Sequence, residues 1–199
     1  VLKINAVGHH FAMNALGVLA AVEALAGDPG RAAVDIFRWK PSAGRGRREV
    51  ISLNPDKRLQ EFELIDDAYN ANPASMAAAL QSLAYIVPSV SNTSNRTSRK
   101  IAILGDMLEL GTDEIKYHIS LAKNLHLRNL DVVHCVGLRM RACYNVLPVE
   151  IRGDWVETAD EFKTKLHTMI LAGDIVLVKG SLGSKVSTIV DLIRNLGQR

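Results

Sequence analysis

The side chains best suited to chemistry lie at the ends of three short apolar runs. Two carboxylates, Asp66 and Asp67, end the first run, and a polar turn then leads to Pro73. Asn72 can cap a helix that begins at this proline, because a proline in the first turn loses no hydrogen bond. The free N–H groups of such a turn attract anions. The junction can therefore hold a ligand, or it is an ordinary capped turn with solvated acids.

Two further apolar runs end in similar turns. The run 101–104 leads into Gly105-Asp106, and the run 176–178 leads into Lys179-Gly180-Ser181. The second turn offers a cation, a hydroxyl and exposed amides before a predicted helix, which suits carboxylates and phosphates. Neither turn matches a dinucleotide or Walker motif. If the three runs are parallel strands, their ends meet at one sheet edge, where open α/β folds bind ligands.

A histidine and an asparagine form a further candidate near the start of the chain. His10 and Asn14 are four residues apart in a predicted helix, so they share one face. An imidazole and an amide together can clasp a planar base, because the amide offers both a donor and an acceptor. The alternative is a polar helix start. The pair His9-His10 has no third ligand, so we assign no metal site.

Composition and charge exclude several function classes. The net charge is +3, and the densest basic patch, residues 45–48, is short and has no aromatic platform, so we predict no nucleic-acid partner. No apolar stretch is long enough for a membrane span, and no signal peptide is visible. Cys135 and Cys143 are too few and too far apart for a disulfide framework or a C-x-x-C site. These observations favour a cytoplasmic protein.

The predicted secondary structure that positions these residues differs between the start of the chain and the remainder. Two helices come first, and a Pro- and Gly-rich linker over 41–46 marks our predicted domain boundary. After it, apolar strands alternate with helices, which predicts an α/β fold: a mostly parallel sheet with helices on both faces. The predicted helices cover residues 10–26, 31–37, 74–86, 114–125, 139–146, 159–171 and 185–196, and the predicted strands cover 49–53, 62–66, 100–104, 132–136 and 175–178. The first two strands are expected to form a hairpin.

Five segments together resemble the Mur ligase family of bacterial cell-wall synthesis. They are Gly8-x-His10-x-x-x-Asn14-Ala15-Leu16, Gly44-Arg45, residues 66–76, residues 104–111 and Val178-Lys179-Gly180-Ser181. They occur in the family's order and at similar spacing, over residues 1–196. The strings at 69–73 and 105–111 are most similar to the members that add D-Ala-D-Ala.

The resemblance implies a fold and a reaction. Residues 1–46 would be the tail of the central ATPase domain, and residues 47–199 the Rossmann-like carboxyl-terminal domain. ATP and Mg2+ would convert the terminal carboxyl of UDP-N-acetylmuramoyl-tripeptide into an acyl phosphate, which the amine of D-Ala-D-Ala attacks. In the family the phosphate-binding loop and the magnesium ligands lie upstream of Val1, so we expect this chain to be inactive without the amino-terminal and central domains. The alternatives are a Mur ligase that adds another amino acid and a stand-alone α/β binding module.

The resemblance also implies roles for individual residues. It places His10 and Asn14 at the adenine, Arg45 at the nucleotide's phosphates and Asp67 at the ribose hydroxyls. It places a second set near the dipeptide or the acyl phosphate: Asn70, Asn72, Lys179 and Ser181. Arg45 and Lys179 are the catalytic candidates, and no metal ligand is assigned.

Two details qualify these roles. Because side chains alternate along a strand, Asp66 and Asp67 should face opposite sides. Asp66 is then expected to be a solvated acid or a brace for the turn. After Ser181 the family commonly continues Arg-Ser, whereas this chain has Leu182-Gly183, which removes a cation from the turn.

Overall fold

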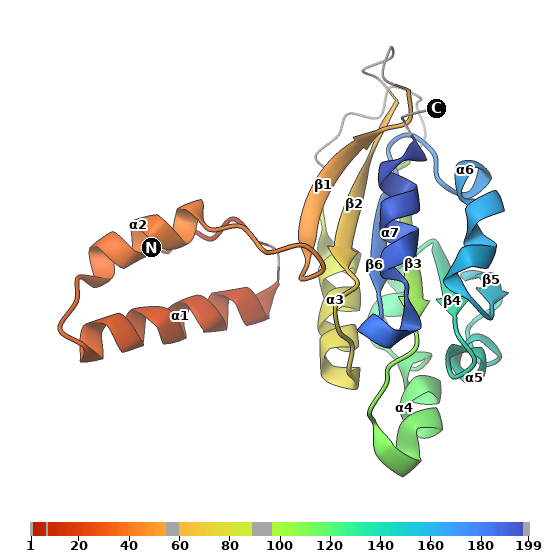
Figure 1. Ribbon diagram of the computed structural model, residues 1–199, viewed down its shortest axis with the longest axis horizontal. Helices are drawn as coiled ribbons and strands as arrows, with labels where there is room; N and C mark the ends of the chain where they lie inside the picture. Colours follow the sequence, from red (N-terminus) through yellow and green to blue (C-terminus); the bar gives the residue numbers. More distant parts are fainter. Residues whose placement is uncertain (1, 7, 55–59, 89–96, 197–199) are drawn as a thin grey trace.

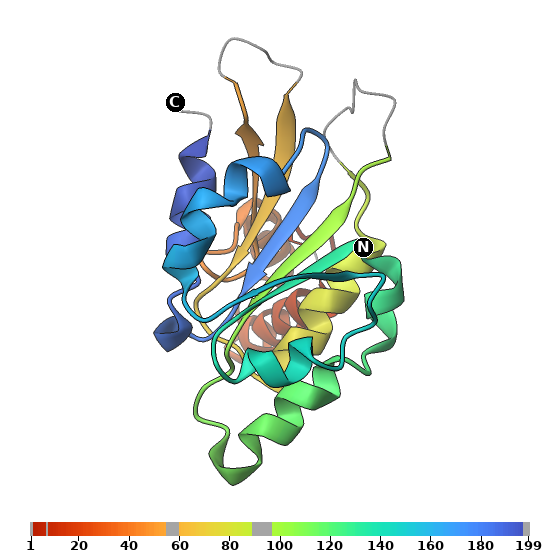
Figure 2. The same cartoon turned by 90° about the vertical axis from the view of Figure 1, so that its right-hand side faces the viewer.

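A single mixed sheet organises most of the chain. The computed structural model describes residues 2–6, 8–54, 60–88 and 97–196. Within them, six strands lie in the order β1-β2-β6-β3-β4-β5 (Figures 1 and 2). The strands are β1 (Arg47–Ser52), β2 (Glu61–Asp67), β3 (Lys100–Gly105), β4 (Val132–Val136), β5 (Arg152–Val156) and β6 (Ile175–Lys179). β1 pairs antiparallel with β2, as the predicted hairpin requires, and all other pairings are parallel.

Helices cover both faces of this sheet, so the predicted fold class is confirmed. The α-helices are α1 (His9–Ala24), α2 (Pro29–Arg38), α3 (Pro73–Tyr85), α4 (Glu114–Leu121), α5 (Met140–Tyr144), α6 (Leu166–Met169) and α7 (Ser187–Arg194). α3, α4 and α5 contribute to one buried cluster, while α6 and α7 contribute to the other.

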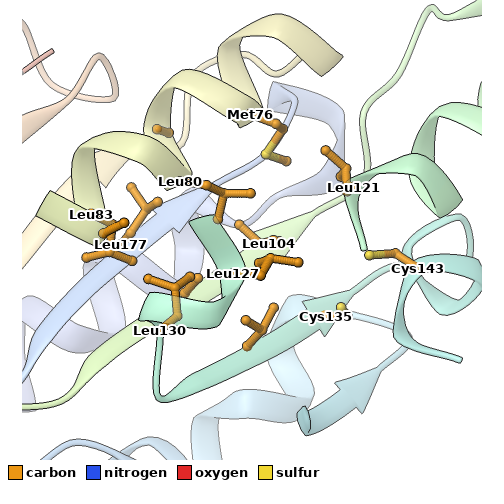
Figure 3. Close-up of a cluster of buried hydrophobic side chains, with 14 of the residues drawn as sticks. Met76, Leu80, Leu83, Leu104, Leu121, Leu127, Leu130, Cys135, Cys143 and Leu177 are labelled. Atoms are coloured by element: carbon orange, nitrogen blue, oxygen red, sulfur yellow. The ribbon is translucent and has the colours of Figure 1, made fainter. Parts of the chain in front are cut away.

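The central strand β6 contributes side chains to the hydrophobic clusters on both faces of the sheet. All five of its residues are buried. Ile175 and Leu177 belong to the cluster under α3, whereas Val176 and Val178 belong to the cluster under α7. Alternate side chains of a strand point to opposite faces, so a strand covered on both sides is apolar along the run between the layers, here Ile175–Val178, and Lys179 comes only at its carboxyl end. Figure 3 shows the first cluster, where side chains of α3 meet those of β3 and β6.

One strand was not predicted, and two predicted helices differ in the structure. β5 was not predicted; it is an edge strand whose first four residues are only partly buried and include Gly153 and Asp154. The predicted helix over 114–125 ends at Leu121, and Asn124 then caps a 3-10 helix, η2 (Leu125–Asn129). The predicted helix over 159–171 is divided into the 3-10 helix η3 (Ala159–Thr164) and α6. Most of the predicted turn at 54–57 and of the polar loop at 88–98 lies outside the described residues.

α1 and α2 form a helical hairpin that projects from the sheet (Figure 1). Asp28 caps α2 by accepting hydrogen bonds from the N–H groups of Gly30 and Arg31. Of the residues of α1, all of which the structure describes, Ala15 alone is buried. The apolar residues Leu16 and Leu25 are 52% and 84% exposed. The sheet therefore leaves most of this helix uncovered.

Candidate functional site

The three polar strand ends meet at one edge of the sheet. β6 lies between β2 and β3, and all three run in parallel. The carboxyl end of β2 carries Asp67, that of β6 carries Lys179, and that of β3 carries Gly105. The prediction that these turns share an edge is therefore confirmed, and the edge is the place where open α/β sheets bind ligands.

Asp67 and Lys179 form an ion pair at this edge. They are paired positions of β2 and β6, and the Lys179 ammonium lies 2.7 Å from Oδ2 of Asp67. Lys179 is 2% exposed and also donates a hydrogen bond of 3.0 Å to the carbonyl of Asn70. Burial raises the pKa of the Asp67 carboxyl, and the nearby ammonium offsets only part of that rise.

Asp66 faces the opposite side of β2, as the alternation of side chains predicted. It is 4% exposed, and its carboxylate accepts hydrogen bonds from the N–H of Gly44 and from Arg194 of α7. The interpretation of Asp66 as a solvated acid is therefore wrong, because α7 covers this face of the sheet. Its alternative role, a brace for the turn, agrees with the hydrogen bond of 3.4 Å that its Oδ1 accepts from the N–H of Ala68.

The turn after β2 is organised by its two asparagines. Asn70 Oδ1 accepts a hydrogen bond of 2.8 Å from the N–H of Ala71. Asn72 is the N-cap of α3, as predicted: its Oδ1 accepts from the Ser75 N–H at 2.8 Å. The Ser75 hydroxyl in turn accepts from the Asn72 N–H at 3.0 Å. This reciprocal pair fixes the start of α3 beside the ion pair.

Arg45 lies in the linker between two glycines with left-handed backbone conformations. Gly44 has φ 76° and Gly46 has φ 80°. A Cβ on residue 44 would also lie 2.9 Å from Cβ of Tyr69, so glycine is required there for space as well as for conformation. The Arg45 guanidinium lies over the Tyr69 ring, 4.2 Å from its centroid. The linker thus presents a cation at the end of β2.

A cavity of about 830 Å³ lies between the helical hairpin and this edge of the sheet. α1 contributes His10 and Asn14 to its lining, the C-cap of α2 contributes Trp39, and the linker contributes Arg45. The sheet side contributes Asp67, Asn70, Asn72 and Lys179. All the predicted site residues except Ser181 therefore line one cavity.

Ser181 is placed differently from the other predicted residues. It is 5% exposed and is absent from the cavity lining. Its hydroxyl donates to the Ala71 carbonyl at 3.3 Å and accepts from the Leu108 N–H at 3.0 Å. The side chain thus ties together the turns that follow β2, β3 and β6. Contact with a substrate stays a prediction.

The surroundings of His10 favour its neutral form. Burial lowers the pKa of its imidazole, and the nearby Asp67 carboxylate opposes this effect. A neutral imidazole has one N–H donor and one nitrogen acceptor, and the amide of Asn14 has an NH2 group that donates and a carbonyl oxygen that accepts. Next to them, the rings of Phe11 and Trp39 lie with centroids 5.7 Å apart. The cavity therefore has an apolar wall and polar groups suited to a planar, hydrogen-bonding ring.

Two features around the end of β3 were not predicted from the sequence. His118 of α4 is fully buried: its Nε2 accepts from the Met107 N–H and its Nδ1 donates to the Glu114 carbonyl. Val186 packs closely against Gly105: a Cβ on residue 105 would lie only 2.5 Å from Cγ1 of Val186, so there is no room for a side chain there. The nearest signal in the sequence was the strand end at Gly105-Asp106, which gave no reason to connect it with a histidine of the next helix.

Comparison with known proteins identifies the family. The family model described as "Mur ligase, glutamate ligase domain" matches residues 46–182. The chain belongs to the Mur ligase family. This Mur ligase chain is similar to the UDP-N-acetylmuramoyl-tripeptide–D-alanyl-D-alanine ligase of Rickettsia prowazekii, with 31% identity over 190 residues. It is also similar to the Bacillus subtilis ligase of the same name, with 30% identity over 196 residues.

These alignments cover 96% of the chain but only 38% and 40% of the two relatives. The Mur ligase chain therefore spans less than half the length of the relatives it matches. A crystal structure of MurF from Acinetobacter baumannii matches with a TM-score of 0.71 and 26% identity, over 94% of this chain and 38% of that one. MurF from Thermotoga maritima in complex with ADP matches with a TM-score of 0.67 over 89% of this chain and 36% of that one. At 20% identity, the second match shows the fold alone.

The described part of this Mur ligase chain has neither a cluster of metal ligands nor a membrane-spanning helix. Among the described residues, no three or more His, Cys, Asp or Glu side chains form a cluster that could hold a metal ion. Within the same residues, no helix has the length and apolar character needed to cross a membrane.

Proposed function

We propose that this chain is the carboxyl-terminal part of an ATP-dependent ligase that joins D-Ala-D-Ala to UDP-N-acetylmuramoyl-tripeptide in cytoplasmic peptidoglycan precursor synthesis. Residues 1–46 would complete the central ATPase domain, and residues 47–199 would form the carboxyl-terminal domain. The observation that carries the proposal is the shared cavity, which joins His10 and Asn14 to Arg45, Asp67 and Lys179. The names of the similar ligases support the choice of substrates.

The cavity residues fit a nucleotide on chemical grounds. His10 and Asn14 supply donors and acceptors for the adenine edge, beside the apolar wall formed by Phe11 and Trp39. The Asp67 carboxylate can accept hydrogen bonds from both ribose hydroxyls. That MurF from Thermotoga maritima forms a complex with ADP is consistent with this assignment.

The remaining residues suit transfer and acceptance of the activated carboxyl group. ATP, when bound, supplies the phosphoryl group that makes the acyl phosphate. Arg45 carries a fixed positive charge on a linker that ends at the cavity, where it would stabilise negative charge on the nucleotide's phosphates. Lys179, with Asn70 and Asn72, would orient the dipeptide that attacks.

Magnesium does not fit the residues described in this chain as a self-contained site. Asp67 is paired with Lys179, and the described residues contain no cluster of metal ligands. We therefore assign Mg2+ to residues outside the chain and derive no step through it. The sequence also contains no phosphate-binding loop, so we expect this chain by itself to hydrolyse no ATP.

The test is an assay of the complete enzyme that carries this chain. Phosphate release should require ATP, UDP-N-acetylmuramoyl-tripeptide and D-Ala-D-Ala together, and should stay at background when a single amino acid such as diaminopimelate replaces the dipeptide. Turnover with diaminopimelate would instead identify a different Mur ligase. A coding sequence that starts at residue 1 and has no upstream phosphate-binding loop would favour a stand-alone binding module.

A further inference from the structure

The linker that carries Arg45 is held in place by the two polar groups of one buried residue. The Asp66 carboxylate accepts a hydrogen bond of 3.0 Å from the N–H of Gly44, and the Asp66 carbonyl accepts one of 2.8 Å from the N–H of Gly46. The Gly44 carbonyl in turn accepts from the N–H of Tyr69 at 3.0 Å. Arg45 is thus flanked on both sides by backbone that β2 and its turn hold fixed.

The Asp66 carboxylate is in turn held by the last turn of α7. Arg194 Nη2 lies 2.8 Å from the same Oδ2 that accepts the Gly44 N–H. The guanidinium also binds Glu49 on β1, with 3.3 Å between Nε and Oε2. Buried carboxylates need such partners, and a guanidinium that bridges two of them fixes their directions as well as their charges.

We infer that Arg194 and Asp66 are positioning residues for Arg45, forming a clamp that runs from α7 through β2 to the interdomain linker. The two glycines allow the backbone its left-handed turns but supply no stiffness of their own. The hydrogen bonds of the clamp restrict the linker backbone, and they thereby fix where the Arg45 guanidinium enters the cavity. The inference rests on the proposed role of Arg45 for its catalytic consequence, but not for the clamp itself.

A matched set of variants tests the clamp in the 199-residue chain. Arg194→Met removes the guanidinium that bridges Glu49 and Asp66. Arg194→Lys keeps the positive charge but cannot bind both carboxylates in the same way. Asp191→Asn is the control, because Asp191 also pairs with Arg194, at 3.3 Å, but is 70% exposed and does not contact the linker. Amide hydrogen exchange of Gly44 and Gly46 is the measurement, with Leu177 in the core of β6 as the internal reference.

We expect Arg194→Met to accelerate exchange at Gly44 and Gly46 by at least about tenfold, with Leu177 unchanged. Arg194→Lys should lie between this variant and the parent, and Asp191→Asn should match the parent. Unchanged exchange at both glycines would overturn the inference. So would equal acceleration at Leu177, because Arg194 would then stabilise the whole domain and not the linker.

A double-mutant cycle in the complete ligase tests the catalytic consequence. If Arg194 acts through Arg45, Arg194→Met should lower kcat more than it changes the KM for ATP, and adding it to Arg45→Ala should cause little further loss. Fully additive losses would contradict the inference. Normal turnover of Arg45→Ala would refute the proposed function of Arg45, while the exchange measurement would still decide whether the clamp exists.

Discussion

Lys179 and Asp67 face each other across two neighbouring parallel strands, with 2.7 Å between ammonium and carboxylate. The Lys179 side chain is 3% exposed and that of Asp67 is 22% exposed. The Lys179 ammonium is almost completely removed from solvent, so it depends on the partly exposed Asp67 carboxylate to balance its charge. The pair therefore stabilises the fold of the cavity as well as placing a cation and an anion in its wall.

The first prediction concerns the stability of this pair. Lys179→Met leaves the Asp67 carboxylate buried without its cation, so the free energy of unfolding should fall by about 3 kcal/mol. Asp67→Asn, introduced together with Lys179→Met, should recover part of the loss. Urea unfolding of the chain measures both. Lys116→Met is the control, because its pair with Asp113 is largely exposed and should contribute under about 1 kcal/mol. Equal effects of Lys179→Met and Lys116→Met would contradict this account.

The second prediction concerns nucleotide binding by Asp67. Removing a carboxylate that accepts two hydroxyl hydrogen bonds should weaken ATP at least about tenfold. The measurement is the KM for ATP of Asp67→Ala in the complete ligase, with thermal melts to detect misfolding. Asp113→Ala, a surface carboxylate remote from the cavity lining, is the matched control. Asp66→Ala is unsuitable as a control, because Asp66 holds Gly44 and Arg194. An unchanged KM for Asp67→Ala would remove Asp67 from the ribose site.

The sequence was sufficient for the fold because its strongest patterns are local. Strands buried on both faces have continuous apolar runs, such as Ile175–Val178 of β6, and the capped start of α3 can be read from Asn72 and Pro73. β5 was missed because an edge strand needs no continuous apolar run. The burial of His118 was not predicted, and Asp66 was misjudged, for a different reason. The Met107 N–H that His118 binds is 11 residues away, and the Gly44 and Arg194 partners of Asp66 are 22 and 128 residues away. The local sequence contains no signal for such contacts.

The third prediction concerns Arg45. Its guanidinium lies over a Tyr69 ring that is itself 46% exposed, so Arg45→Ala should cost the fold no more than about 1 kcal/mol. Its proposed contact with the nucleotide's phosphates predicts a loss of kcat of about a hundredfold or more. Turnover of the complete ligase and denaturant unfolding of the same variant separate the two effects. Loss of stability and turnover in proportion would point to a structural role instead.

The fourth prediction concerns His118, which fixes the turn after β3. Its Nε2 accepts the N–H of Met107 at 3.0 Å in a fully buried position. His118→Leu fills similar space but leaves that N–H without an acceptor, so stability should fall by about 1–3 kcal/mol. Exchange of the Met107 amide should accelerate in the same variant. His126→Leu, a change in the neighbouring 3-10 helix, should leave the Met107 amide protected; acceleration there too would indicate general loosening.

His134 on β4 gives the chain a pH dependence that can be measured without any ligand. It is 6% exposed, its ring meets that of Phe162 edge-on at 5.6 Å, and its Nδ1 accepts the Asp154 N–H at 2.8 Å. Burial lowers the pKa of the imidazole from 6.5 to about 4, against the opposing effect of Asp154. The native state thus keeps His134 neutral over a range in which an unfolded chain protonates it.

The fifth prediction follows from that difference. Between about pH 6.5 and about pH 4 the unfolded state binds the extra proton, so stability falls as the pH is lowered through this window. The loss from His134 should reach about 3 kcal/mol at pH 4, relative to pH 7 and above. His134→Asn keeps an acceptor for the Asp154 N–H but cannot titrate, so urea unfolding at several pH values should show a loss smaller by that amount. Parallel stability curves for the two proteins would show that His134 titrates normally and that its burial does not govern the acid sensitivity of this domain.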